Sequence, residues 1–316
     1  MATLKELTHI PDRITSGHRM CAGCGAPMVV KWVMKAVKPE DKVVVANATG
    51  CLEVSTTLYP YSAWKDSFIH TAFESAAATI SGVEAAYKNL KGKGKIKDNY
   101  KFIAFGGDGG TYDIGFQSLS GAMERGHDML YVCYDNGAYM NTGIQRSSAT
   151  PAGADTTTSP KGKKTSGKVQ FSKDLTMIMT SHNLPYVAQT VPAIPGTKYT
   201  LDLYNKANRA INEFKGAKFI NVIAPCPRGW RCDTATELDT IKLAVETCYW
   251  PLYEVINGEF KLNYKPKDKL PIEEWLKVQG RFSHLLKSEE GRKKVEEIQK
   301  EIDRRWEKLL FLCGEK

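Results

Sequence analysis

Two cysteines, Cys21 and Cys24, lie three positions apart in the segment CAGC near the start of the chain. Thiolates at this spacing can form half of a zinc site, a redox disulfide, or half of an iron–sulfur site. Either metal site needs further ligands from elsewhere in the sequence. The chain has eight cysteines, so all three possibilities remain open at this point.

A second candidate site is the glycine-rich segment FGGDGG at 105–110. Gly107 and Gly109 would let the backbone approach a phosphate closely. Asp108 would then point a carboxylate at that phosphate, which is favourable only if a divalent cation lies between them. Mg²⁺ prefers near-octahedral oxygen ligands and usually takes one or two from the protein. The segment therefore predicts a magnesium–diphosphate site.

The remaining protein ligands of that ion are expected in the segment YDNGAYMNTG. Between FGGDGG and the turn in this segment lie one predicted helix and one predicted strand. Asn136 can offer its side-chain oxygen, and Ala138 can offer its backbone carbonyl. A lone G-D-G is usually an ordinary turn. The combination of G-D-G, helix, strand and an Asn-containing turn is much harder to explain in that way.

The elements that must position these residues alternate along the chain. Apolar runs that end in polar turns predict strands, and helical apolar spacing predicts helices between them. This alternation indicates an α/β fold, a parallel sheet with helices on both faces. Ligands bind beyond the carboxyl ends of such strands, so the polar turns should converge. The predicted strands lie in 42–51, 101–110, 128–143, 185–191 and 217–226, and the predicted helices are 26–37, 70–90, 115–126 and 200–214.

The pattern changes after residue 250. Residues 1–250 are expected to form the cofactor-binding domain, and 251–316 a C-terminal extension. The extension should contain a short hairpin within 251–266 and a charged amphipathic helix from about 288. We expect this helical tail to act as a clamp or as a contact for a partner, and not to belong to the sheet.

Composition narrows the class of protein. Hydrophobic residues make up 42% of the chain, enough for a substantial core. No apolar run reaches the roughly 18 residues of a membrane span, and the N-terminus lacks an apolar signal core, so a cytoplasmic protein is expected. Thiols stay reduced there, which favours metal binding or packing over disulfides. The net charge of +9 would suit an anionic partner, and a basic zinc-containing nucleic-acid-binding module is one alternative.

Several motifs together identify a resemblance. They are CAGCG, NATGC, AFGGDGGTYDIG, YDNGAYMNTGIQRSSATPAGADTTTSP, APCPRGW and ETCYWPLYEV. The chain resembles the beta subunits of the 2-oxoacid:ferredoxin oxidoreductases, most closely those that act on pyruvate. The resemblance extends from about Gly17 to about Leu286. It implies a thiamine-diphosphate-binding fold and the cofactors thiamine diphosphate, Mg²⁺ and one [4Fe–4S] cluster.

The resemblance also implies which residues bind these groups. The cluster ligands would be the motif cysteines Cys21, Cys24, Cys51 and Cys226. Cys232 follows six positions later and stays open as the fourth ligand. Cys133, within an apolar strand, is expected in the core, and Cys248 and Cys313 are expected to be structural. The cofactor site would comprise Thr49, Gly107, Asp108, Gly109, Asn136 and Ala138, and Asn141 would contact the substrate.

The implied activity is the coenzyme A-dependent oxidative decarboxylation of pyruvate to acetyl-CoA and CO₂, with electrons passed through the cluster to ferredoxin. Related subunits handle 2-oxoisovalerate, 2-oxoglutarate or oxalate, and a non-redox thiamine decarboxylase or synthase is a further alternative. Neither Glu53 nor Glu74 lies in a motif for thiamine activation, so an alpha subunit is expected to supply that glutamate. No bacterial-ferredoxin C-x₂-C-x₂-C-x₃-C run is present, so gamma and ferredoxin-like delta subunits are expected as partners. Neither nucleic acid nor membrane is an expected partner.

Overall fold

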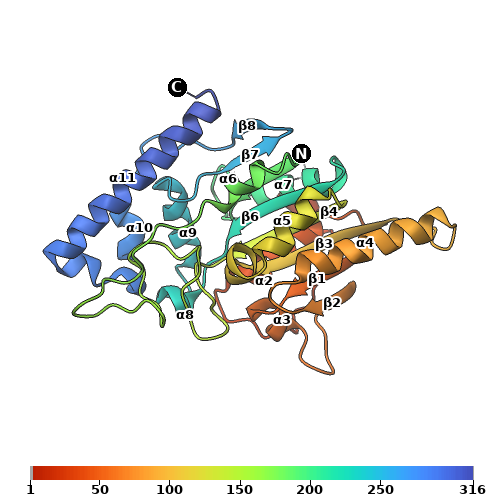
Figure 1. Ribbon diagram of the computed structural model, residues 1–316, viewed down its shortest axis with the longest axis horizontal. Helices are drawn as coiled ribbons and strands as arrows, with labels where there is room; N and C mark the ends of the chain where they lie inside the picture. The colour runs from red at the N-terminus through yellow and green to blue at the C-terminus, as the bar shows by residue number, and fades with distance from the viewer. Residues whose placement is uncertain (1–2, 316) are drawn as a thin grey trace.

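The computed structural model describes residues 3–315 and shows one mixed sheet surrounded by helices (Figure 1). The strands are β1 Lys42–Ala48, β2 Ser67–Thr71, β3 Tyr100–Gly107, β4 Met129–Asp135, β5 Tyr186–Thr190, β6 Ala217–Ile223, β7 Tyr253–Ile256 and β8 Glu259–Leu262. The helices are α1 Leu4–Thr8, α2 Gly25–Lys35, α3 Cys51–Thr56, α4 Ala76–Gly92, α5 Phe116–Glu124, α6 Leu175–Thr180, α7 Asp202–Asn212, α8 Pro227–Trp230, α9 Glu237–Glu246, α10 Glu273–Lys277 and α11 Glu289–Leu312, with a π-helical turn at Gly109–Asp113.

The strand order is β2-β1-β3-β4-β6-β5-β7-β8. The first six strands in this order are parallel. The hairpin of β7 and β8 continues the sheet in antiparallel fashion beside β5. The predicted parallel sheet is therefore confirmed, and the predicted hairpin lies at its edge. The expected division at residue 250 falls where the strand direction changes, with residues 1, 2 and 316 outside the described residues.

Helices cover both faces of the sheet, as the alternation of elements predicted. Alternate strand residues point to opposite faces, so each strand contributes to two cores. On one face, α2 and α7 bury apolar side chains against β1, β3, β4 and β6. On the other, α4, α5 and α6 do the same. The carboxyl ends of the strands stay uncovered by these helices, which leaves that edge to the polar turns.

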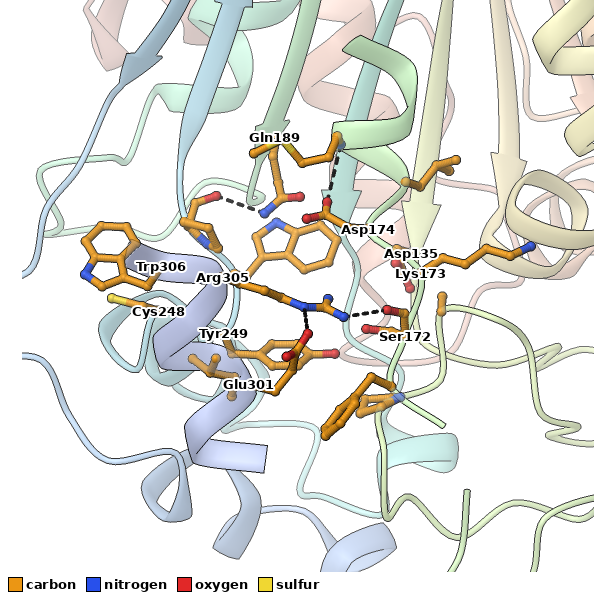
Figure 2. A pocket seen from close by; sticks show the side chains of 18 of the residues that line it. Asp135, Ser172, Lys173, Asp174, Gln189, Cys248, Tyr249, Glu301, Arg305 and Trp306 are labelled. Carbon is orange, nitrogen blue, oxygen red and sulfur yellow. Dashed lines mark hydrogen bonds and ion pairs between the residues drawn. The ribbon is translucent and has the colours of Figure 1, made fainter. Parts of the chain in front are cut away.

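The C-terminal helix α11 packs against the body of the protein along one side (Figure 1). Its Trp306 belongs to the core on the face of the sheet that α4, α5 and α6 cover. Its Ile298 and Ile302 belong to a third core, together with residues of α9 and α10. Figure 2 shows Arg305 of α11 bonded to Glu301 at 2.7 Å and to the carbonyl of Ser172 at 2.8 Å. The tail therefore packs onto the body of the protein, which leaves its expected role as a clamp or a partner contact a prediction.

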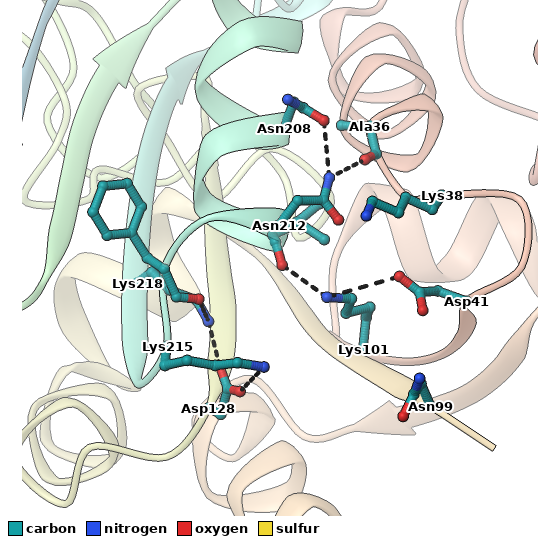
Figure 3. A network of polar contacts seen from close by, with 12 residues as sticks. Ala36, Lys38, Asp41, Asn99, Lys101, Asp128, Asn208, Asn212, Lys215 and Lys218 are labelled. Carbon is teal, nitrogen blue, oxygen red and sulfur yellow. Dashed lines mark hydrogen bonds and ion pairs between the residues drawn. The ribbon is translucent and has the colours of Figure 1, made fainter.

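Ion pairs and hydrogen bonds of lysine side chains lie at the amino-terminal edge of the sheet. Lys218 of β6 donates to Asp128 at 2.5 Å, and Lys101 of β3 donates to the carbonyl of Ile211 at 3.0 Å (Figure 3). Lys218 is buried, so its ion pair offsets the cost of removing the ammonium from water. Part of the positive charge of the chain is thus neutralised within the fold.

One predicted element is wrong at its start. The predicted helix 70–90 begins too early, because His70 and Thr71 belong to the edge strand β2 and the helix α4 begins at Ala76. The remaining predicted strands and helices appear near their expected positions. Among residues 3–315, no helix is both long enough and apolar enough to cross a membrane.

Candidate active site

Asp108 lies at the carboxyl end of β3, directly before the π-helical turn. Its side chain is fully buried. Glycine is required by space at position 109: a Cβ on Gly109 would come within 2.4 Å of the Tyr139 ring. Burial, together with the nearby Asp135, raises the pKa of Asp108 well above its usual value. A buried carboxyl in such a place is suited to a cation, which would favour its charged form.

The geometry around Asp108 fits Mg²⁺. The end of the Asn136 amide that faces Asp108 lies 2.9 Å from its Oδ1 and 2.8 Å from the carbonyl oxygen of Ala138. With nitrogen at this position, the amide donates two hydrogen bonds. With oxygen there, the amide oxygen has one carboxylate oxygen and one carbonyl oxygen as its neighbours. Ligands at the 2.0–2.1 Å of octahedral Mg²⁺ are separated by about 2.8–3.0 Å, which matches both distances.

A single cavity brings together the residues predicted for the thiamine site. It is a small cavity of about 20 Å³, lined by the turns that follow β1, β2, β3 and β4. The convergence expected at the carboxyl edge of the sheet is therefore present. The lining residues predicted from the sequence are Thr49, Gly107, Asp108, Gly109, Asn136, Ala138 and Asn141. The Thr49 hydroxyl donates to the carbonyl of Thr71 at 2.9 Å and lies 2.8 Å from Nε2 of His70, so its orientation is fixed.

The four motif cysteines line a second cavity of about 370 Å³. They come from the loop before α2, the start of α3 and the start of α8; they are Cys21, Cys24, Cys51 and Cys226. One water needs roughly 10–15 Å³ measured in this way, so the cavity has room for a group of many atoms. Burial raises the pKa of Cys24 to about 12 and that of Cys226 to about 11. Such pKa values favour the protonated thiol wherever no metal is bound.

Cys232 does not line the cysteine cavity. Its thiol donates to Oε1 of the buried Glu237 at 3.1 Å. Cys133 is fully buried in β4, as predicted. Within residues 3–315, no three His, Cys, Asp or Glu side chains are close enough to hold a single metal ion. A cubane cluster instead takes one thiolate at each of four irons, so its ligands surround a cavity.

The two cavities share a wall. Cys51, Asn136, Met140 and Asn141 line both of them. The side chain of Asn141 makes a hydrogen bond to Cys51, which opposes the rise in the pKa of this thiol caused by burial. A group bound in one cavity would therefore lie next to a group bound in the other.

Met140 was missed from the sequence, although it sits between two residues that were considered. The one sequence feature connected with Met140 is Gly229 in the segment APCPRGW. A Cβ on Gly229 would meet the Met140 sulfur at 2.2 Å, so the glycine makes room for it. Glu53 and Glu74 do not line the thiamine cavity. Asp108 is the sole carboxylate among the residues that line it.

Comparison with known proteins agrees with this geometry. Residues 48–222 match the family model "Thiamine pyrophosphate enzyme, C-terminal TPP binding domain", so the chain binds thiamine diphosphate through this domain. A solved 2-oxoglutarate:ferredoxin oxidoreductase from Magnetococcus marinus shares the fold, with a TM-score of 0.55 and 20% identity over 73% of this chain and 79% of that one.

Curated relatives match over almost their whole length. Pyruvate synthase subunit PorB of Thermotoga maritima is 54% identical over 98% of this chain and 96% of its own. The subunit of the same name from Methanocaldococcus jannaschii is 52% identical over 94% and 95%. Ketoisovalerate oxidoreductase subunit VorB of Pyrococcus abyssi is 43% identical over 96% and 94%. With these identities and the thiamine-binding domain, the chain belongs to the beta subunits of the 2-oxoacid:ferredoxin oxidoreductases, in the family of pyruvate synthase subunit PorB.

Proposed function

We propose that this chain is the catalytic subunit of a coenzyme A-dependent pyruvate:ferredoxin oxidoreductase, which converts pyruvate to acetyl-CoA and CO₂. The observation that carries the proposal is the wall shared by the thiamine cavity and the four-cysteine cavity. Bound thiamine diphosphate supplies an electron sink for decarboxylation, and a [4Fe–4S] cluster supplies a one-electron acceptor. Both groups are useful to the same reaction only if they are neighbours.

The chain's own residues hold and orient these groups. Asp108, Asn136 and the carbonyl of Ala138 would bind Mg²⁺, while the bare backbone of the 107–109 turn admits the diphosphate. Thr49 presents a fixed hydroxyl to the cavity. Asn141 would hold the substrate at the wall toward the cluster, since its side chain lies against Cys51.

The cluster would be held by Cys21, Cys24, Cys51 and Cys226. Cys226 is preferred to Cys232 as the fourth ligand because its sulfur lines the cavity and accepts a hydrogen bond from the backbone of Gly229 at 3.4 Å. Amide hydrogen bonds to sulfur stabilise the charge of a thiolate. The thiol of Cys232 instead donates a hydrogen bond to Glu237.

Partner subunits complete the enzyme in this proposal. An alpha subunit supplies the glutamate that activates thiamine, since the cavity lining offers only the carboxylate of Asp108, which is committed to the metal. Gamma and ferredoxin-like delta subunits carry electrons to ferredoxin. Residues 1–250 form the cofactor-binding domain and 251–316 the extension. A reducing cytoplasm suits the free thiols of the cluster site.

The test begins with strictly anaerobic purification. We expect about four irons per chain and bound thiamine diphosphate. Cys51→Ala should abolish the paramagnetic signal of the reduced cluster, whereas Cys133→Ala, in the core, should leave it. Zinc in place of iron would refute the redox function. Reduction of viologen with a panel of 2-oxoacids then identifies the substrate.

A second substrate has specific support. The VorB relative is named for ketoisovalerate and is 43% identical to this chain, close to the range of some pyruvate synthase relatives. If the enzyme reduces viologen faster with 2-oxoisovalerate than with pyruvate, the branched substrate replaces pyruvate. The same assay also covers 2-oxoglutarate and oxalate.

A further inference from the structure

The segment RSSATPAG, residues 146–153, lies in the longest motif of the sequence, yet it has no role in the site described so far. Within it, the hydroxyl of Ser147 donates to Oδ2 of Asp108 at 2.5 Å. We propose that Ser147 is a positioning residue, which holds Oδ2 so that Oδ1 faces Asn136 and Ala138 and can bind the metal. This inference rests on the proposed role of Asp108 as a Mg²⁺ ligand.

The two oxygens of Asp108 have separate partners. Oδ1 lies 2.9 Å from the Asn136 amide and also accepts the backbone N–H of Asn136 at 3.3 Å. Oδ2 accepts from Ser147. Because the side chain of Asp108 is fully buried, solvent cannot replace a lost partner. The serine therefore decides which oxygen remains for the metal.

The direction of the Ser147 hydroxyl is fixed by its surroundings. Its oxygen accepts the backbone N–H groups of Ala149 and Thr150, both at 3.2 Å. The hydroxyl of Thr150 lies 3.3 Å away, but it donates to the carbonyl of Gly137 at 2.7 Å. A serine has one proton to donate. With its lone pairs engaged by these amides, that proton points to Asp108.

Two further contacts hold the segment against the metal-binding turns. Ser148 donates through its backbone and its hydroxyl to Asp113, at the other end of the π-helical turn that begins after Asp108. The buried Lys168 donates to the carbonyls of Thr150 at 2.6 Å and Ser148 at 3.2 Å. Residues 147–150 are thus anchored from three sides.

The approach of Lys168 itself depends on a glycine. Gly167 has a φ of +81°, and a Cβ there would meet the carbonyl oxygen of Gly153 at 2.6 Å. Only glycine permits this close contact without strain. Gly167 therefore supports the serine segment, because it lets its own backbone lie directly against the backbone of Gly153 and Ala154.

Groups that orient a metal ligand without touching the metal typically change its affinity by 10–100-fold. The experiment strips the purified holoenzyme with a chelator and measures thiamine diphosphate retained per chain over a range of Mg²⁺ concentrations. We expect Ser147→Ala to need about 10–100-fold more Mg²⁺ for half-maximal retention. Iron content should stay unchanged, because the cysteine cavity is lined by other residues.

Ser147→Cys keeps the shape of the side chain, with a somewhat larger sulfur atom, but replaces a strong donor with a weak one, so it tests the idea even if the alanine variant does not fold. It should lie between wild type and Ser147→Ala. Ser148→Ala is the matched control, since it keeps the backbone hydrogen bond of residue 148 to Asp113 and removes no contact of Asp108; its shift should stay below about 3-fold, well under the range expected for Ser147. Wild-type Mg²⁺ dependence in Ser147→Cys overturns the inference. Cofactor binding by wild type that needs no Mg²⁺ would instead refute the metal site itself.

Discussion

At the scale of single residues, Asp108 is the fully buried carboxyl of the site, and burial raises its pKa. Asp108→Asn keeps the size of the side chain and removes the charge that faces the ion. We expect thiamine diphosphate retention to collapse at Mg²⁺ concentrations that saturate the wild type, because the diphosphate charge is then uncompensated. Mass analysis measures the cofactor and iron analysis the cluster, which should remain.

The matched control for that change is Asp113→Asn. Asp113 pairs with Ser148 and, at 3.6 Å, with Lys173, and it does not line the thiamine cavity. Its replacement should lower cofactor content far less. Equal cofactor content in Asp108→Asn and wild type would reduce Asp108 to a turn residue.

Glu237 makes a separate prediction about pH. Burial raises its pKa to about 7. The unfolded chain releases this proton near the ordinary value of 4.5, but the folded protein keeps it until about pH 7. Between these values the folded state binds more protons, so its free energy of unfolding falls as pH rises, by up to about 3 kcal/mol.

The variant Glu237→Gln cannot ionise and should lose less stability over that window. The measurement is the difference in unfolding midpoint between wild type and variant at pH 4.5 and at pH 7.5, under anaerobic conditions. At the higher pH, the unfolding midpoint of the wild type should fall relative to that of the variant. Curves that run parallel would show that Glu237 ionises as easily in the folded protein as in the unfolded chain.

At the scale of elements, α11 is the one whose role the sequence described least completely. Figure 2 shows Trp306 of this helix beside Cys248, on the loop that leads from α9 into β7. The indole is buried in the core of one sheet face. Trp306→Ala should therefore cost about 3–5 kcal/mol of unfolding free energy, through lost burial and the cavity left behind.

Glu307→Ala, one position along the same helix and exposed, is the control and should stay within about 0.5 kcal/mol of wild type. Anaerobic denaturant unfolding compares the two. If Trp306→Ala is as stable as Glu307→Ala, then α11 does not clamp the body of the chain in solution and is free for a partner.

At the scale of the whole molecule, the incomplete thiamine site is the main feature. The carboxyl edge of the sheet supplies a metal site, a cavity and the cysteine cavity beside it, but the cavity lining has no second carboxylate. Removal of the proton from C2 of thiamine depends on a general acid–base partner worth roughly 10² to 10⁴-fold. We therefore expect hydrogen–deuterium exchange at C2 to be slow in the isolated chain.

Exchange should accelerate when the alpha partner is added, together with viologen reduction. Rapid exchange in the isolated chain would contradict this prediction and would direct attention to Glu53 or Glu74. Glu53 is buried, accepts from Thr57 at 3.2 Å and lies 3.5 Å from His70, so it would have to leave these contacts to act.

The sequence by itself determined the fold class and most elements, because apolar runs and polar turns are local signals. The edge strand β2 was missed because it lacks such a local signal. Its residues SFIHT are only partly buried and carry little apolar pattern, so their conformation depends on pairing with β1. Such pairing is a property of the folded chain and leaves a weak trace in the local sequence.

The sequence also determined the chemistry of the ligands, since carboxylate, amide and thiol groups stood at the ends of predicted strands. Only the tertiary structure decided which of them meet. Cys226 lines the cavity and Cys232, six positions later, turns to Glu237, because the short helix α8 separates their directions. Ser147 reaches Asp108 across 39 positions of chain. Contacts between residues so far apart depend on how the elements pack, and packing is set by the whole core rather than by any local pattern.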